Sequence, residues 1–235
     1  MKLTTLLIPL LIGSAVAIET RWNFDKNEAG KPPKGWTAAS GIWTVVKDAT
    51  APSKSMAMAQ QAKSDSELFN VIVADTPSIK HVEIAVKLKS VAGEVDQGGG
   101  VVWRYRDAQN YYVCRFNPLE TNFRVYKVVA GKRTTLKAAA DIKVPTGKWV
   151  EVKAVMSVDR IRCYLNGKLL LEVKDATLTE AGKVGLWTKA DAQTLFDDLI
   201  AREAPVMSDA RPHHQPKLKL EERLEKRELW EKRKR

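Results

Sequence analysis

Apolar and polar residues alternate with a period of two along much of the chain between residues 19 and 204. The segment HVEIAVKL, residues 81–88, is apolar at every second position, and WVEVKAVMSV, residues 149–158, repeats the pattern as far as Val158. Successive side chains of a β-strand point to opposite faces, so this period predicts strands with one buried face. No long helical period interrupts it. The alternation therefore favours an all-β fold.

Tight turns separate the alternating segments. Asn166-Gly167 lies between two apolar runs, which is the strongest short signal for a β-hairpin, and Ala130-Gly131-Lys132 marks a second turn. Hairpins of this kind predict a single antiparallel β-sandwich. We expect the inward positions of its strands to be buried: Ile84, Val86, Trp103, Cys114, Phe116, Val152, Ala154 and Phe196.

The first 17 residues do not fit this pattern. Lys2 precedes a short apolar run, and Ala15-Val16-Ala17 resembles the cleavage site of a secretory signal peptide. The run is shorter than the ~20 residues that a spanning helix needs. An uncleaved anchor is the alternative. No other stretch could cross a membrane, so we expect residues 18–204 to form one exported domain, periplasmic or extracellular.

Residues 205–235 change character again. Three prolines between Ala204 and Lys217 indicate a linker, and residues 217–235 hold nine basic and five acidic residues. Acidic and basic residues three or four apart support a solvated helix. This tail is either a marginal helix without a partner or an electrostatic tether to an anionic surface.

Composition limits the possible partners. The formal net charge of +11 favours anionic surfaces such as acidic polysaccharide, lipopolysaccharide or lipid headgroups, although it also fits a basic surface with no special partner. We expect neither nucleic acid nor a cofactor. Cys114 and Cys163 are too few for a metal site. His81 is the only histidine before the linker, which excludes Ser-His-Asp chemistry in the domain.

We predict that the two cysteines are unpaired. Cys114 falls on a core face beside Trp103. Cys163 lies in a hairpin whose arms disagree about which face is buried: Ile161, Cys163 and Leu165 form one apolar set, but a two-residue loop would not place Leu169 and Leu171 opposite them.

The stretch GEVDQGGGVVWRYRDAQNYYVCRF, residues 93–116, alternates arginine with aromatic residues. If Arg106 faces Tyr111 across a hairpin, Trp103 faces Cys114 on the core side. The strand at residues 122–129 follows, with Arg115 opposite Arg124. The other face then gathers a set of polar and aromatic residues that we predict to bind a ligand: Arg104, Tyr111, Arg115, Asn117, Asn122, Arg124 and Tyr126.

Neighbouring arginines repel one another on a sheet, so acids or a ligand must compensate. Glu83, Glu120 and Glu151 are the acidic candidates. In one interpretation they neutralise the arginines in a structural network. In the other, the face binds a sugar or an anion, since arginine forks bind carboxylates and tyrosines stack on sugar rings.

Three motifs carry a resemblance: WNFD at residues 22–25, GGGVVWRYRDAQNYYVCRFNPLETNFRVYK at 98–127, and AGKVGLWTKADAQTLFDDLIA at 181–201. They resemble the concanavalin A-like lectin/glucanase superfamily, and specifically secreted bacterial laminin G-like domains related to the 3-keto-disaccharide hydrolase group. The resemblance implies a jelly roll whose concave face holds the ligand. It also implies that Phe196 packs inside and that Asp197-Asp198 lies near the first strand.

The resemblance does not carry over an activity. Glucanases of this superfamily use a Glu-x-Asp-x-x-Glu run, whereas here Glu94 and Asp96 are followed by Gly99, so we read both acids as loop residues. The favoured function is a non-catalytic carbohydrate-binding or surface-interaction module, for a sugar that could be acidic. One alternative is a glycoside-active enzyme, a hydrolase or lyase, with Glu83 or Glu151 as its acids. The other is a structural envelope protein docked by its basic tail.

Overall fold

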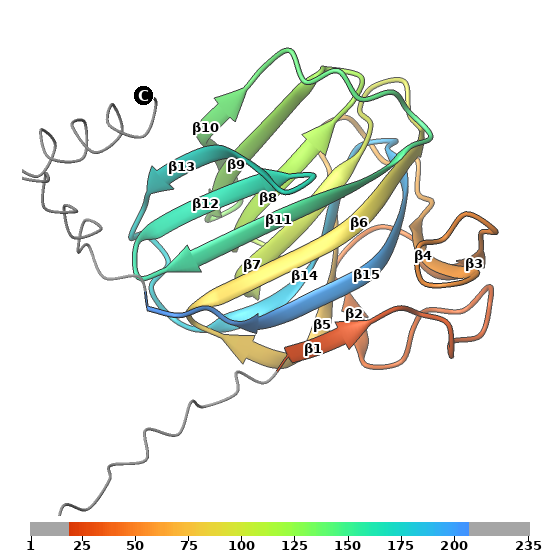
Figure 1. The fold of residues 1–235 in the computed structure, drawn as a ribbon, viewed down its shortest axis with the longest axis horizontal. Helices are drawn as coiled ribbons and strands as arrows, with labels where there is room; N and C mark the ends of the chain where they lie inside the picture. The colour runs from red at the N-terminus through yellow and green to blue at the C-terminus, as the bar shows by residue number, and fades with distance from the viewer. Residues whose placement is uncertain (1–18, 207–235) are drawn as a thin grey trace, which may run out of the picture.

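The computed structural model describes residues 19–206, and every regular element in that range is a β-strand. Two antiparallel sheets face each other as a sandwich, which confirms the predicted fold class (Figure 1). None of the described residues forms a helix long and apolar enough to cross a membrane. The predicted signal peptide, residues 1–17, lies outside the described residues, as does the predicted tail beyond residue 206.

Sheet A has eight strands in the order β13-β12-β11-β6-β15-β4-β3, with β1 paired to β15 as a side branch. The pairing of Trp22 in β1 with Leu199 agrees with the implied position of Asp197-Asp198 near the first strand. The strands of this sheet are β1 (Glu19–Trp22), β3 (Trp43–Lys47), β4 (Met56–Gln60), β6 (Val82–Ala92), β11 (Trp149–Ser157), β12 (Arg160–Leu165), β13 (Lys168–Lys174) and β15 (Gln193–Glu203).

Sheet B has seven strands in the order β10-β9-β8-β7-β14-β5-β2. The chain crosses from one sheet to the other after β6 and again after β14, and both crossings matter for the site. The strands of this sheet are β2 (Trp36–Ala38), β5 (Phe69–Ile79), β7 (Gly99–Asp107), β8 (Asn110–Asn117), β9 (Asn122–Val129), β10 (Lys132–Ala139) and β14 (Gly182–Lys189).

The main core fills the space between the sheets. The eight inward residues that we expected to be buried all lie in it, with Phe196 among the fully covered side chains. The Trp103 indole donates to the sulfur of Met156 on the opposite sheet (3.1 Å) and stacks beside Tyr112, with ring centres 5.7 Å apart. Val158 is the exception to the predicted pattern. It is exposed, because β11 ends at Ser157 and the chain turns there.

The predicted register holds on one side of β8 and fails on the other. Between β8 and β9, Arg115 pairs with Arg124, as predicted. Between β7 and β8 the predicted pairing of Trp103 with Cys114 is wrong by two residues, because Trp103 pairs with Tyr112. Side chains repeat every two residues, so the same set still points inward as far as Trp103.

The hairpin of β12 and β13 shows how a two-residue turn is compatible with apolar residues on both strands. Asn166-Gly167 forms the predicted two-residue turn, since Leu165 pairs with Lys168. A bulge then shifts the register, so that Cys163 pairs with Leu171. One extra residue in β13 gives two inward residues of β12 apolar partners, since Cys163 faces Leu171 and Ile161 faces Val173.

Both cysteines are buried and unpaired, as predicted. Cys114 belongs to β8 in sheet B and Cys163 to β12 in sheet A, and the two thiols approach each other across the core. Burial raises the pKa of Cys114, and the neighbouring Cys163 raises it further. The thiol is therefore held in its protonated, unreactive form.

Candidate functional site

The side of sheet B that faces away from sheet A carries a second apolar cluster, which we call the concave cluster. The rings of Phe69 and Tyr105 are half-buried at its edge. Its buried members are Val71, Val73, Val102, Tyr111, Val113, Tyr126, Val128 and Trp187. The outward face of an antiparallel sandwich is commonly solvated, so burial on this face needs a physical cause.

Arg133 shows that the cause is curvature. It lies on β10, whereas Phe69 lies on β5, and β9, β8, β7 and β14 stand between these strands. In a flat sheet, five spacings of ~4.8 Å would separate β10 from β5 by roughly 24 Å. The Arg133 Cζ atom is instead 5.1 Å from the ring centre of Phe69 and 4.8 Å from that of Tyr126. Sheet B is therefore strongly concave on this side, and Arg133 reaches from the edge strand β10 across to β5.

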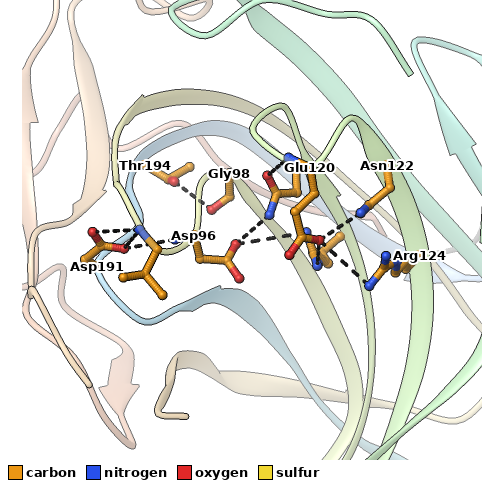
Figure 2. A network of polar contacts seen from close by, with 10 residues as sticks. Asp96, Gly98, Glu120, Asn122, Arg124, Asp191 and Thr194 are labelled. Atoms are coloured by element: carbon orange, nitrogen blue, oxygen red, sulfur yellow. Dashed lines mark hydrogen bonds and ion pairs between the residues drawn. The ribbon is translucent and has the colours of Figure 1, made fainter. Parts of the chain in front are cut away.

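The loop between β6 and β7 stands at one end of the concave face and is held by Asp191 (Figure 2). The Asp191 carboxylate accepts hydrogen bonds from the backbone N–H groups of Glu94 (2.7 Å), Val95 (3.1 Å) and Asp96 (3.0 Å). Burial opposes ionisation of Asp191, but these donors outweigh it and hold its pKa below the usual value. The hydroxyl of Thr194 also donates to the Gly98 carbonyl at 2.8 Å.

Fixing this loop places Asp96 against β8. Its carboxylate accepts a hydrogen bond from Asn117 (2.8 Å), and Arg115 Nη1 lies 4.0 Å away. Asp96 is 2% exposed. Burial raises the pKa of Asp96, although the charge of Arg115 works in the opposite direction.

Glu120 faces the other side of the same arginine. Its Oε2 accepts hydrogen bonds from Arg115 (2.9 Å) and Asn122 (2.8 Å) and lies 3.8 Å from Arg124. Burial opposes ionisation, but Asn122 and Arg115 outweigh it and lower the pKa of Glu120 to about 2. Of the acids expected to neutralise the arginines, Glu120 does so, and Asp96 is the unexpected second partner.

The concave face leaves many of its polar atoms without a hydrogen-bond partner. Each atom is buried and, within residues 19–206, makes no hydrogen bond of good geometry, although burial raises the pKa of the Tyr111 hydroxyl and the Trp187 indole lies near enough to oppose that rise. The atoms are the hydroxyls of Tyr111 and Tyr126, Nε1 of Trp187, Nε and Nη1 of Arg115, Nη1 of Arg133 and Oδ1 of Asn122. Buried polar groups in folded proteins are nearly always paired, so a group of unpaired ones on a single face calls for an explanation.

Most of the predicted ligand residues are brought together here. Tyr111, Arg115, Asn117, Asn122, Arg124 and Tyr126 share the concave side of β8 and β9. They do not form the open, shallow face that we expected, because all but Arg124 are nearly fully covered. Arg124 keeps 37% of its side chain exposed. The curvature of sheet B folds the other side chains inward.

Arg104 is separated from this group, so its predicted place on the face is wrong. It has a left-handed backbone (φ 47°) at an irregularity of β7. Its guanidinium donates to the carbonyls of Lys80 (3.0 Å), Leu178 (2.6 Å) and Val158 (3.0 Å). The bulge turns Arg104 toward these loops. It also turns Tyr105 onto the concave cluster, whereas the predicted alternation, two residues on from Trp103, put Tyr105 on the core side.

Glu83 and Glu151 are also misplaced by the prediction. They belong to β6 and β11 of sheet A, so they cannot line the concave face of sheet B. Glu83 binds Arg202 at 2.8 Å. Glu83 stands opposite Val155, four residues along β11 from Glu151, which separates the two acids by ~13 Å. That separation is larger than the ~5–9.5 Å between the two carboxyl groups of a glycosidase.

Three contributors to the site were missed: Asp96, Arg133 and Trp187. The signal for Arg133 was present, because a turn at Ala130-Gly131 places it opposite Val128, on the face of Tyr126. Asp96 gave no such signal, since its position depends on a loop clamped from the far end of the chain. No three side chains of His, Cys, Asp or Glu within residues 19–206 are placed to hold a metal ion.

Two cavities adjoin the network on another side. One of about 260 Å³ is lined by Lys63, Glu94 and Asp191, and one of about 190 Å³ meets it at Gln193. Neither is lined by an aromatic ring. Ligand sites in proteins generally combine aromatic or apolar walls with a few polar groups, which favours the concave face over these cavities.

Comparison with known proteins identifies the fold. No family model matches the chain, and no curated protein matches its sequence. Among solved structures, the carbohydrate-binding module CBM66 from Bacillus subtilis is similar, with a TM-score of 0.61 at 18% identity over 72% of this chain and 96% of that one. Domain 4 of AbnA, a GH43 extracellular arabinanase from Geobacillus stearothermophilus solved with arabinotriose, gives 0.55 at 13% identity over 81% and 95%.

A third similar structure is a Bacillus subtilis protein of unknown function with a galectin-like fold. Its TM-score is 0.53 at 10% identity, over 74% of this chain and 91% of that one. Identities this low show a shared fold and nothing finer. The chain is thus a β-sandwich of the architecture found in these carbohydrate-binding and galectin-like structures.

Proposed function

We propose that this protein is a non-catalytic carbohydrate-binding module of laminin G-like type, and that it binds a saccharide, an acidic one in particular, on the concave face of sheet B. One observation carries the proposal: buried donors and acceptors without partners lie among aromatic rings on that face. Sugar hydroxyls can satisfy such groups while the sugar ring packs on an aromatic face.

The fold adds weight to this proposal. CBM66 is a carbohydrate-binding module by name, and the arabinanase domain was solved with arabinotriose. Fold alone does not transfer a ligand, so the argument rests on the residues of this face. A glycan array probed with the whole protein tests it. Binding to at least one glycan, lost in a Trp187→Ala protein that circular dichroism shows to be still folded but kept in Trp149→Ala on sheet A, is the expected result.

A glycoside-active enzyme is the second candidate, and one observation favours it. The pKa of Asp96 is raised by burial, whereas Glu120 keeps a pKa of about 2. Two carboxyl groups whose pKa values are pushed apart suit an acid and an ionised partner. Release of reducing sugar from any glycan that binds, abolished in Asp96→Asn, would replace the binding-module proposal with this one.

Export and tethering are further parts of the proposal. We infer that residues 1–17 direct the protein to the periplasm or the exterior and that the basic tail after residue 205 associates with an anionic envelope surface, as in the structural-protein alternative. N-terminal sequencing of protein recovered from a bacterial host tests the first inference. A chain start near Ile18 is expected. Loss of envelope association on deleting residues 207–235 tests the second.

A further inference from the structure

The unpartnered atoms of the concave face are mostly donors. Arg115 contributes Nε and Nη1 and Arg133 contributes Nη1, whereas the indole N–H of Trp187 has the Tyr111 hydroxyl nearby. These groups cannot accept a hydrogen bond. The two tyrosine hydroxyls can do either, and Asn122 Oδ1 alone is purely an acceptor. A ligand that satisfies this set must be rich in acceptors.

Charge points the same way. The charges of Arg115, Arg124, Arg133 and Lys189 act on the site, and those of Asp96 and Glu120 oppose them. Glu120 takes bonds or ion pairs from Arg115 and Arg124 together. Within residues 19–206, Arg133 forms no ion pair. Its guanidinium lies instead against the rings of Phe69 and Tyr126. Nη1 of Arg133 is buried without an acceptor, which is costly for a charged group, so a negative group is the missing element.

The two arginines converge on one ring. Arg115 on β8 and Arg133 on β10 flank Tyr126 on β9, with guanidinium carbons 5.9 Å and 4.8 Å from its ring centre. Their unpartnered nitrogens and the Tyr126 hydroxyl therefore belong to one small region. Oxyanions such as carboxylates and sulfates bind strongly to groups of arginine N–H donors.

We propose that this region is an oxyanion site, in which Arg115 and Arg133 bind the carboxylate or sulfate group of an acidic saccharide beside the hydroxyl of Tyr126. The inference rests on the proposed saccharide-binding function and states which chemical group anchors the ligand. Arg133 covers the site in its present position across Phe69 and Tyr126. Because arginine is long and flexible, Arg133 can turn toward the anion and so uncover the face of Phe69 for the sugar ring.

The test uses Arg133→Gln, since Arg133 is half-exposed and its loss leaves no acid unpaired within the described residues. Lys132→Gln is the matched control. It removes the same charge from the neighbouring position of β10, which points to the opposite side. Calorimetric titration at fixed ionic strength compares uronic acid glycosides with their neutral counterparts, namely methyl glucuronide with methyl glucoside and the corresponding galactose pair. Sodium sulfate serves as a simple oxyanion probe.

We expect the acidic member of a pair to bind more tightly than the neutral one. Arg133→Gln should weaken that binding about ten- to a hundredfold, as the loss of a charge-assisted hydrogen bond does. Lys132→Gln should change it less than about twofold. Arg133→Lys should restore part of the affinity, because it keeps the charge without the fork. The side-chain Nε–H signal of Arg115 should shift on titration with either uronate or sulfate.

The possible failures are distinct. If glycans bind but acidic and neutral members bind equally, or if Arg133→Gln behaves like Lys132→Gln, the oxyanion site is wrong and saccharide binding stands. If sulfate moves the Arg115 signal while no glycan binds, the oxyanion site stands and the saccharide function is wrong. If neither sulfate nor uronate affects Arg115 or Arg133, the oxyanion site is excluded, whatever the glycan array shows.

Discussion

The two outward faces of this sandwich are built from the same alternating pattern and end in opposite states. On sheet A, the outward residues meet solvent and pair with one another, as Arg202 does with Glu83 and Lys87 with Asp198. On sheet B, the outward residues are buried, and several of their polar atoms stay without partners. The alternation of the sequence determines which residues share a face of a sheet. The curvature of the sheet determines whether the side chains on that face are exposed to solvent or buried.

The largest expected difference between the faces concerns tryptophan. Trp187→Ala should destabilise the protein by about 3–5 kcal/mol, because the ring is fully covered in the concave cluster and its loss leaves a cavity. Trp149→Ala on sheet A should cost about 1 kcal/mol, since that ring carries only a hydrogen bond to Thr50 and a contact with Lys89. Urea denaturation of the two variants measures both. Equal losses would mean that the concave cluster is not a second core.

The next contrast concerns arginine. Arg115→Ala should lower the free energy of unfolding by about 2–4 kcal/mol, because Asp96 then stays buried without a cation. Arg202→Ala, which breaks a partly exposed pair on sheet A, should cost less than about 1 kcal/mol. Thermal and urea unfolding compare the two. An Arg115→Ala protein as stable as the parent would show that the buried network contributes no stability. One that is less stable but binds every glycan as the parent does would contradict the binding face.

A smaller effect is expected in acid. Burial opposes ionisation of Glu120, but Asn122 and Arg115 lower its pKa to about 2 from an ordinary 4.5. The stability that ionised Glu120 contributes is therefore present above pH 4.5 and is lost as the pH falls toward 2. Glu120→Gln should remove that part of the acid dependence, by less than about 1 kcal/mol because the side chain is 40% exposed.

Asp96 should act in the opposite direction. Burial raises its pKa, so the folded state takes up its proton more readily than the unfolded chain does, and this group favours folding as the pH falls. Stability curves of Asp96→Asn and Glu120→Gln between pH 2 and pH 7 should therefore depart from the parent with opposite slopes. Departures of the same sign would show that the two carboxylates do not differ as the structure indicates.

The smallest effect compares the hairpin turns of the two sheets. Both turns pair a left-handed residue with a left-handed glycine: Asn166-Gly167 in sheet A and Ala130-Gly131 in sheet B. Asparagine tolerates this conformation better than alanine does. Ala130→Asn should therefore raise the stability by about 0.5 kcal/mol, which differential scanning calorimetry can resolve, whereas Asn166→Ala should lower it by a similar amount. If Ala130→Asn gives no gain in stability, the pairing of β10 with β9 is enough to fix the left-handed turn, whichever residue occupies position 130.

Local pattern was enough to predict the strands, the core and the register of β8 with β9. It was not enough for Arg104 and Tyr105, because a single bulge reverses the face of every later residue in a strand. It also missed that Tyr111 and Tyr126 would be covered, since the bending of a sheet depends on all of its strands together. Asp96 was read as a loop residue, which is correct, but the partner that fixes the loop lies 95 residues further along the chain.

That separation in sequence has a consequence for the order in which parts of the chain can fold during synthesis. The amides of Glu94, Val95 and Asp96 depend on a carboxylate in the turn between β14 and β15, the last two strands. Closing so long a loop is slow compared with forming a hairpin. A nascent chain can thus complete the strands that carry Arg115 and Tyr126 while Asp96 still has no fixed place. The concave face therefore reaches its final form only after the last two strands, β14 and β15, have docked in their separate sheets.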